Sequence, residues 1–219
     1  MSYTGALSTF SDWTCRTLVA QTARRYSNML YIPHHFVELL LWVEDKRFAA
    51  HFGMDPVAVM RAIIFNLKSR GRTLQGASTI AQQVYTIRLR RTGTFSRSFP
   101  YKMKQIGWSL YASAVKTKAS ILDEYISTVY WGRSYHGVDK AADGYFNATR
   151  GSLSIAQSFF LAERLAAPNR VSVRRISNLL KRTSIRLALA RNGGALADII
   201  TLYDRIYGCG GEMWELLAK

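Results

Sequence analysis

Two adjacent carboxylates, Glu44 and Asp45, directly follow the strongest apolar stretch of the sequence, which runs from Phe36 to Val43. A carboxylate at the end of an apolar helix lies where desolvation can raise its pKa towards neutrality, as a general base requires. An acid pair at a helix end is also a common solvated terminus. The residue types therefore make Glu44 a candidate base but leave both interpretations open.

A second segment, from Gly76 to Gln83, places small and hydroxyl-bearing residues before a predicted helix. Ser78 is the predicted N-cap, and Gln82 and Gln83 fall within the helix that it begins. Free backbone N–H groups at such a helix start bind phosphate groups. An ordinary N-cap has the same sequence, so this segment predicts either a helix boundary or an anion site.

Basic residues follow this segment and form a cationic belt. The belt comprises Arg88, Arg90, Arg91, Arg97, Lys102 and Lys104. Lys102 lies three residues before Gln105, so both are expected on one helix face. A belt of this kind can neutralise a diphosphate leaving group, or it can be a solvated helix face.

The composition supports a partner that carries negative charge. Among 219 residues, 30 Lys and Arg oppose 14 Asp and Glu, which gives a net charge of +16. Such a field attracts nucleic acid, anionic lipid or a phosphorylated substrate, and it also keeps a basic protein soluble. No nucleic-acid motif accompanies the charge. Two cysteines form no disulfide framework, and the four histidines show no metal-ligand spacing.

The elements that must position these residues are helical. Apolar periodicity and capping signals predict helices from Pro33 to about Glu44, from Asp55 to Ser69, from Ser78, and over 101–116, 120–131, 137–146, 154–166 and 176–190. No alternating run is long enough for a central sheet. The sequence therefore predicts a single all-α domain. Neither a signal peptide nor a spanning helix is visible, since the longest apolar run is far below the ~20 residues that a bilayer requires.

In this order, the segments resemble the family-51 glycosyltransferases, the glycan-polymerising module of penicillin-binding proteins and monofunctional transglycosylases. The first family motif matches Glu44, Asp45, Phe48, His51, Gly53 and Asp55. The second matches Gly76, Ser78, Thr79, Ile80, Gln82 and Gln83. The fourth matches Ile121, Leu122, Tyr125, Tyr130 and Gly132, and Lys181-Arg182 resembles a fifth.

The resemblance implies an all-α, lysozyme-like head with a small membrane-facing jaw. It implies an N-terminal extension over 1–30, the glycosyltransferase domain over 31–190 and a C-terminal helical tail over 191–219. It also implies a location on the outer, periplasmic face of the bacterial cytoplasmic membrane, with peripheral attachment to an anionic surface. The implied partners are lipid II, the growing glycan on its polyprenyl diphosphate, and cell-wall synthesis proteins, with no nucleic acid.

The implied reaction transfers the growing glycan to the 4-hydroxyl of lipid II, with inversion and release of polyprenyl diphosphate. Glu44 is the expected base. The expected substrate and diphosphate site comprises Asp45, Phe48, His51, Ser78, Thr79, Gln82, Gln83, Arg97, Lys102 and Lys104. No cofactor is required, and a divalent cation, magnesium or manganese, is optional.

Three positions depart from the family pattern. The second acidic position of the site is Gln105, a Lys that usually follows the second Gln is Thr86, and the Asn of the fourth motif is Ser127. Arg88 or Arg90 is expected to supply the charge missing at Thr86. Two alternatives stay open: a non-catalytic relative that binds lipid II or partner proteins, and a lysozyme-like enzyme that cleaves glycans.

Overall fold

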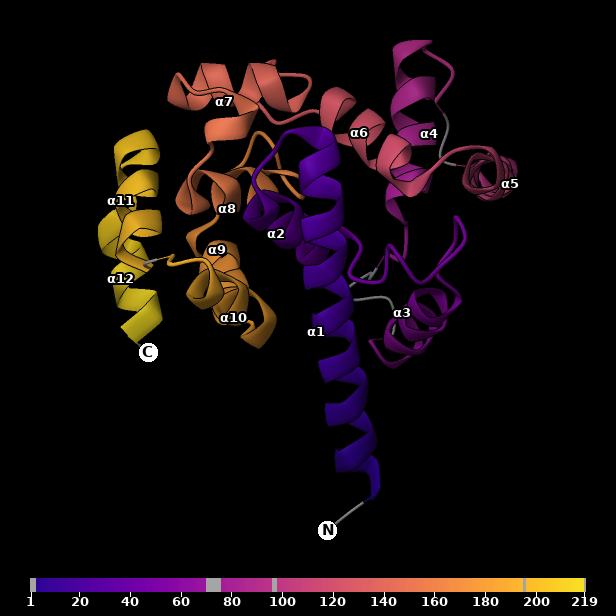
Figure 1. Ribbon diagram of the computed structural model, residues 1–219, viewed down its shortest axis with the longest axis horizontal. Coiled ribbons are helices and arrows are strands. Elements are labelled where there is room, and N and C mark those ends of the chain that lie inside the picture. Colours follow the sequence, from indigo (N-terminus) through magenta and orange to yellow (C-terminus); the bar gives the residue numbers. More distant parts are fainter. Residues whose placement is uncertain (1–2, 70–75, 96–97, 195, 219) are drawn as a thin grey trace. The chain divides into compact units, whose positions relative to one another are not determined.

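The computed structural model describes residues 3–69, 76–95, 98–194 and 196–218, with side chains described from Thr14 onwards. Within these ranges all regular secondary structure is helical, which confirms the predicted all-α class. The chain forms two compact units (Figure 1). The first comprises Met1–Lys46 and Val129–Lys219, and the second comprises Arg47–Thr128.

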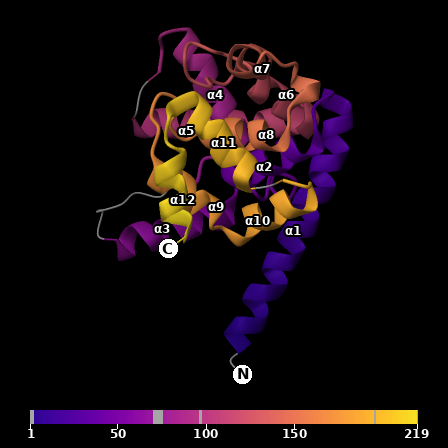
Figure 2. The same cartoon turned by 90° about the vertical axis from the view of Figure 1, so that its left-hand side faces the viewer.

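The first unit is built around the apolar helix α2 (His34–Glu44), which contacts α1 (Tyr3–Leu30), α8 (Ile155–Arg164) and α10 (Thr183–Arg191). Because α2 has neighbours on several sides, its residues from Phe36 to Trp42 are all buried. Each buried Leu of this kind contributes about 1.5–3 kcal/mol of burial free energy. In both ribbon views the N-terminal half of α1 extends beyond the other helices of this unit (Figures 1 and 2).

The remaining helices of the first unit are α7 (Val138–Phe146), the short 3-10 helix η1 (Arg150–Ser152), α9 (Val173–Leu180), α11 (Leu196–Tyr207) and α12 (Gly210–Ala218). Helix α11 packs on α8, and α12 packs on both α9 and α11. A buried polar cluster holds α11 to α8: the Glu163 carboxylate accepts hydrogen bonds from Arg164 and from the buried Tyr203 hydroxyl. The helical tail is therefore part of the core of this unit.

The prediction of one continuous helix near the C-terminal end of the family domain is wrong. The segment 176–190 forms two helices, α9 and α10, which are separated at Lys181-Arg182. The apolar residues explain the break, because a continuous helix that buries Ile176 and Leu180 would next turn 183 and 184 inward. The structure instead buries Ile185, Ala188 and Leu189, so the two helices have different phases.

The second unit contains α3 (Pro56–Lys68), α4 (Ile80–Arg91), α5 (Phe99–Val115) and α6 (Lys118–Thr128). Helix α4 packs on both α5 and α6 and buries Ile80, Ala81 and Val84. Asp55 caps α3 as predicted, because its carboxylate accepts from the backbone N–H of Ala58 at 2.9 Å and Pro56 takes the first helical position. Most apolar side chains of α3 stay exposed, in contrast to those of α2.

A glycine fixes the loop that precedes α3. Gly53 has a φ of +76°, which favours glycine, and a Cβ at this position would lie 2.3 Å from the backbone oxygen of Ser109 in α5. The loop therefore packs backbone to backbone against α5. Any larger residue at position 53 would force the loop and the helix apart.

Candidate active site

The start of α4 has the predicted geometry, but its N-cap is Thr79 and not Ser78. The Thr79 hydroxyl accepts from the backbone N–H of Gln82 at 3.3 Å and donates to the backbone oxygen of Gly53 at 2.6 Å. Thr79 is buried, so both bonds are shielded from water. Ser78, which directly precedes this N-cap, is exposed, so its hydroxyl can face a ligand.

Lys102, at the start of α5, is the belt residue that the structure brings to this helix start. Its ammonium donates to Ser78 Oγ at 3.3 Å, to Gln82 Oε1 at 3.1 Å and to Gln105 Oε1 at 2.7 Å. All three acceptors are neutral, and within the described part of the chain no carboxylate pairs with Lys102. Desolvation lowers the pKa of Lys102 from its ordinary value. Lys102, Ser78, Gln82 and Gln105 form a cluster, the Lys102 cluster, whose positive charge is not paired with any carboxylate of the described residues.

Gln105 lies beneath Lys102 and is 5% exposed. While its oxygen accepts from Lys102, its Nε2 donates to the backbone oxygen of Gln82 at 3.0 Å and to Thr86 Oγ1 at 2.8 Å. A divalent cation does not fit this site, because the Gln105 oxygen already contacts an ammonium and the other donors are neutral. Among the described residues no group of three or more His, Cys, Asp or Glu side chains has a metal-binding arrangement.

The aromatic and imidazole side chains of the first motif support the loop that precedes α3. Phe48 is 1% exposed, and its ring packs edge-on against the His51 ring. Lys118, at the start of α6, places its ammonium 4.6 Å from the centre of the Phe48 ring and donates to the backbone oxygen of His51 at 2.7 Å. Arg47 forms an ion pair with Asp55 in the same loop. Phe48 and His51 therefore help to hold this loop to the start of α6 through Lys118, within the second unit.

Lys118 is absent from the sequence-based list of site residues. It belongs to no motif, and its contact with His51 joins residues 67 positions apart. The only signal in the sequence is a basic residue at the start of a helix, where lysine has no favourable dipole interaction. Such a signal indicates a tertiary contact but does not identify the partner.

Glu44 and Asp45 lie in the first unit, at the C-terminal end of α2. Glu44 is half-buried, and Asp45 is buried with its backbone N–H bonded to the oxygen of Leu41. Apart from Asp45, the residues of the predicted substrate and diphosphate site belong to the second unit. The candidate base Glu44 therefore belongs to the first unit, and the Lys102 cluster belongs to the second.

Two other predicted site residues, Gln83 and Lys104, do not join the Lys102 cluster. The Gln83 oxygen accepts from the Tyr125 hydroxyl of α6 at 3.0 Å, so this side chain holds α4 to α6. Lys104 is exposed and lies two residues beyond Lys102, so it leaves α5 on a different face. Arg97 lies outside the described residues.

The structure does not place Arg88 or Arg90, which are expected to replace the charge missing at Thr86, in the Lys102 cluster. Arg88 forms an ion pair with Glu124 and stacks on Trp108, and Arg90 stacks on Phe95. Both guanidinium groups are therefore committed to other partners. The Thr86 hydroxyl accepts a hydrogen bond from Gln105 Nε2 at 2.8 Å.

The fold and the Lys102 cluster define an all-α protein in which the start of a helix and an ammonium with no acidic partner among the described residues present positive charge together. The sequence model of a family described as Transglycosylase matches residues 13–190. The chain belongs to this transglycosylase family, and the resemblance drawn from its motifs is confirmed.

Several bacterial relatives of the chain are named penicillin-binding protein 1A. Penicillin-binding protein 1A of Rickettsia prowazekii is 35% identical over 143 residues, which cover 64% of this chain and 18% of that protein. Penicillin-binding protein 1A of Aquifex aeolicus is 35% identical over 146 residues, with 66% and 19% covered. The protein of that name from Pseudomonas aeruginosa is 36% identical over 142 residues, with 64% and 16% covered. The chain spans less than a fifth of the length of these curated relatives.

Proposed function

We propose that this chain polymerises lipid II into peptidoglycan glycan strands and releases polyprenyl diphosphate. The observation that carries the proposal is the Lys102 ammonium, which neutral acceptors hold beside the start of α4. A leaving diphosphate accumulates negative charge as its bond to the sugar breaks, and a preorganised cation beside a helix start stabilises that charge. Ser78 adds a hydroxyl that can donate to a phosphate oxygen.

In the proposed reaction, the Glu44 carboxylate takes the proton from the 4-hydroxyl of the acceptor sugar. The oxygen attacks the anomeric carbon of the donor in line with the leaving group, so the new glycosidic bond forms as the bond to diphosphate breaks and the carbon inverts. The proton stays on Glu44 until solvent removes it. Lys102 and the first N–H groups of α4 interact with the departing diphosphate.

A non-catalytic relative that binds lipid II is the second candidate. Gln105 is the observation that favours it, because an amide at this position can neither take up a proton nor carry charge. A glycan-cleaving enzyme is less well supported, because hydrolysis of a glycosidic bond has no diphosphate for the Lys102 cluster to stabilise.

Purified protein with lipid II in detergent, with products resolved by size, separates these functions. The wild type is expected to form long glycan strands, and Lys102→Met is expected to lower the rate at least about tenfold through the lost electrostatic stabilisation. Lys140→Met, which removes an exposed lysine of α7, is the matched control and should retain wild-type rates. Binding of lipid II without consumption would favour the non-catalytic relative. Shortening of preformed glycan would favour the hydrolase.

Turnover is proposed to need no divalent cation, because Lys102 already occupies the oxygen of Gln105. The wild type should therefore consume lipid II at similar rates with magnesium and with a chelator. A loss of activity of tenfold or more in the chelator, reversed by added magnesium or manganese, would contradict this part of the proposal.

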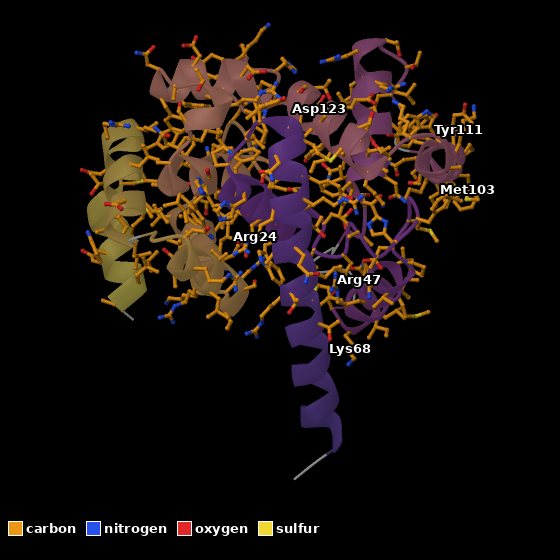
Figure 3. All side chains as sticks on the ribbon, viewed as in Figure 1. Arg24, Arg47, Lys68, Met103, Tyr111 and Asp123 are labelled. Carbon is orange, nitrogen blue, oxygen red and sulfur yellow. The ribbon has the colours of Figure 1, made fainter. Side chains whose placement is uncertain are left out.

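Attachment to the membrane is proposed to be peripheral and to involve the second unit. Within the described residues, no helix combines the length and the apolarity needed to cross a bilayer. Helix α3 exposes Met60, Ile64 and Leu67 and also carries Arg61 and Lys68. Figure 3 shows Met103 and Tyr111 at the periphery of α5, and both are more than half exposed. Apolar side chains flanked by basic ones suit an anionic membrane surface.

A further inference from the structure

Thr86 and Gln105 are hydrogen-bonded to each other, although they lie 19 residues apart on α4 and α5. Both positions depart from the pattern of the resembling family, which has Lys at the first and Glu at the second. The structure thus joins two separate departures in one contact. This contact lies directly beneath the Lys102 ammonium, because Gln105 Oε1 accepts from Lys102 at 2.7 Å.

The hydrogen bonds of the pair fix the role of each group. The Thr86 hydroxyl donates its single proton to the backbone oxygen of Gln82 at 3.1 Å and accepts from Gln105 Nε2 at 2.8 Å. The Tyr101 hydroxyl, 2.6 Å from Thr86 Oγ1, must then be a donor. Since Gln105 Nε2 also donates to the Gln82 oxygen, the amide can only turn its oxygen towards Lys102.

The net charge of Thr86 and Gln105 together equals that of the Lys and Glu found at these two positions in the family pattern. Lys at position 86 and Glu at position 105 would together carry no net charge, and neither do Thr86 and Gln105. In both arrangements the charge of Lys102 remains for an anion. A buried ion pair exchanged for a well-bonded neutral pair is often neutral or stabilising, whereas removal of one charged partner alone is costly.

We propose that Thr86 and Gln105 act as one coupled unit that positions the Lys102 ammonium, so that Gln105 is a positioning residue and not the remnant of a lost acid. The role of this position in turnover rests on the proposed function, but the coupling itself does not. One consequence is that Gln105→Glu alone impairs the site, and only Gln105→Glu combined with Thr86→Lys preserves it.

The single substitutions each create a mismatch. In Gln105→Glu, a carboxylate oxygen replaces the Nε2 that lies 3.0 Å from the Gln82 backbone oxygen, so two acceptors face each other and Lys102 is neutralised. In Thr86→Lys, an ammonium faces the Nε2 donor of Gln105, and a second positive charge adjoins Lys102. In the double variant the new ammonium donates to the new carboxylate, and both mismatches disappear.

A double-mutant cycle with three measurements tests the coupling. The first is the melting temperature, the second is the affinity for inorganic diphosphate by calorimetry, and the third is the pKa of Lys102 by NMR of its labelled side chain. Gln157→Glu in α8 is the matched control, because it makes the same change of charge in a capping box that accepts Glu equally well.

Gln105→Glu is expected to lower the melting temperature by about 5 °C, from the lost buried bond in a chain of this size. It should also weaken diphosphate binding about tenfold and raise the pKa of Lys102. In the double variant, the melting temperature should return to within about 2 °C, and the diphosphate affinity to within about threefold, of the wild type. The Gln157→Glu control should match the wild type in all three measurements.

Additive effects of the two substitutions would overturn the proposal. So would a Gln105→Glu variant that matches or exceeds the wild type in stability and diphosphate affinity. If the wild type consumes no lipid II while the melting temperature and the Lys102 pKa still show the coupling, the proposed function fails and the coupled unit stands. If the wild type is active and both measurements are additive, the proposed function stands and the coupled unit fails.

Discussion

Two side chains have the main roles in the proposed reaction. Glu44 is the base that takes up the proton, and Lys102 is the cation that stabilises the leaving group. They differ in how the protein holds them. Lys102 is restrained by three neutral oxygens within the second unit, so its position follows from the packing of α4 on α5. Glu44 is placed by α2, whose apolar residues are buried along nearly its whole length.

The role of Glu44 gives the prediction at this scale. Glu44→Gln should leave the fold intact and reduce turnover of lipid II by about 10²-fold or more, because a positioned proton acceptor contributes about this much. Steady-state rates with lipid II in detergent measure the effect. Glu215→Gln, at an exposed position of α12, is the control and should be fully active. Near-normal polymerisation by Glu44→Gln would remove this residue from the mechanism.

At the scale of elements, the loop of residues 47–55 links the first motif to the helices of the second unit. Gly53 contacts α5, Thr79 at the start of α4 donates to Gly53, and Lys118 of α6 donates to His51. One short loop thus joins the starts of α4 and α6 and the middle of α5. The family motif around Phe48, His51 and Gly53 acquires a structural reason, since it packs the helices that position Lys102.

Substitution of Gly53 tests this packing. Gly53→Ala should lower the free energy of unfolding by about 2 kcal/mol or more, because the methyl group would clash with the Ser109 backbone oxygen. Gly93→Ala is the matched control: Gly93 has a similar φ of +72° but open space around it, so only the backbone cost of about 1 kcal/mol is expected. Urea unfolding of both variants measures the difference. Equal losses would show that the contact with α5 is not tight.

Helix α3 gives a second prediction at this scale. Ile64→Glu should weaken binding to anionic vesicles at least about tenfold, because it places a charge among exposed apolar side chains that are proposed to enter the lipid interface. Stability should change little, since Ile64 is 46% exposed. Leu196→Glu, at a 37% exposed position of α11, is the control. Vesicle cosedimentation compares the variants, and unchanged binding by Ile64→Glu would exclude α3 as the contact.

At the scale of the whole molecule, the net charge of +16 acts over longer distances than any single contact. Binding to vesicles that contain anionic lipid should weaken progressively as salt rises, because exposed charges are screened beyond about 8 Å at physiological ionic strength. Cosedimentation at salt concentrations from about 50 to about 500 mM measures this dependence. Binding that does not change with salt would show that apolar insertion alone holds the protein at the membrane.

The sequence determined the all-α class, most helix boundaries and the family, because these depend on local signals. Apolar periodicity, Pro56 at a first helical position and the Asp55 cap can each be recognised within one or two turns of the chain. The motifs around Glu44 and Ser78 also indicated the transglycosylase family, because each motif is a short continuous segment. The break at Lys181-Arg182 was missed because both helices have strong periodicity, and only their phases differ.

Tertiary structure decided which of the candidate residues meet. Thr79 is the N-cap in place of Ser78 because the loop at Gly53 offers its hydroxyl a buried acceptor. Of the predicted belt, Lys102 reaches the start of α4, whereas Arg88 and Arg90 are held by partners on α5, on α6 and at Phe95. Thr86 and Gln105 looked like two independent losses in the sequence. Their hydrogen bond joins two helices, and no local pattern encodes such a contact, because it exists only once α4 packs on α5.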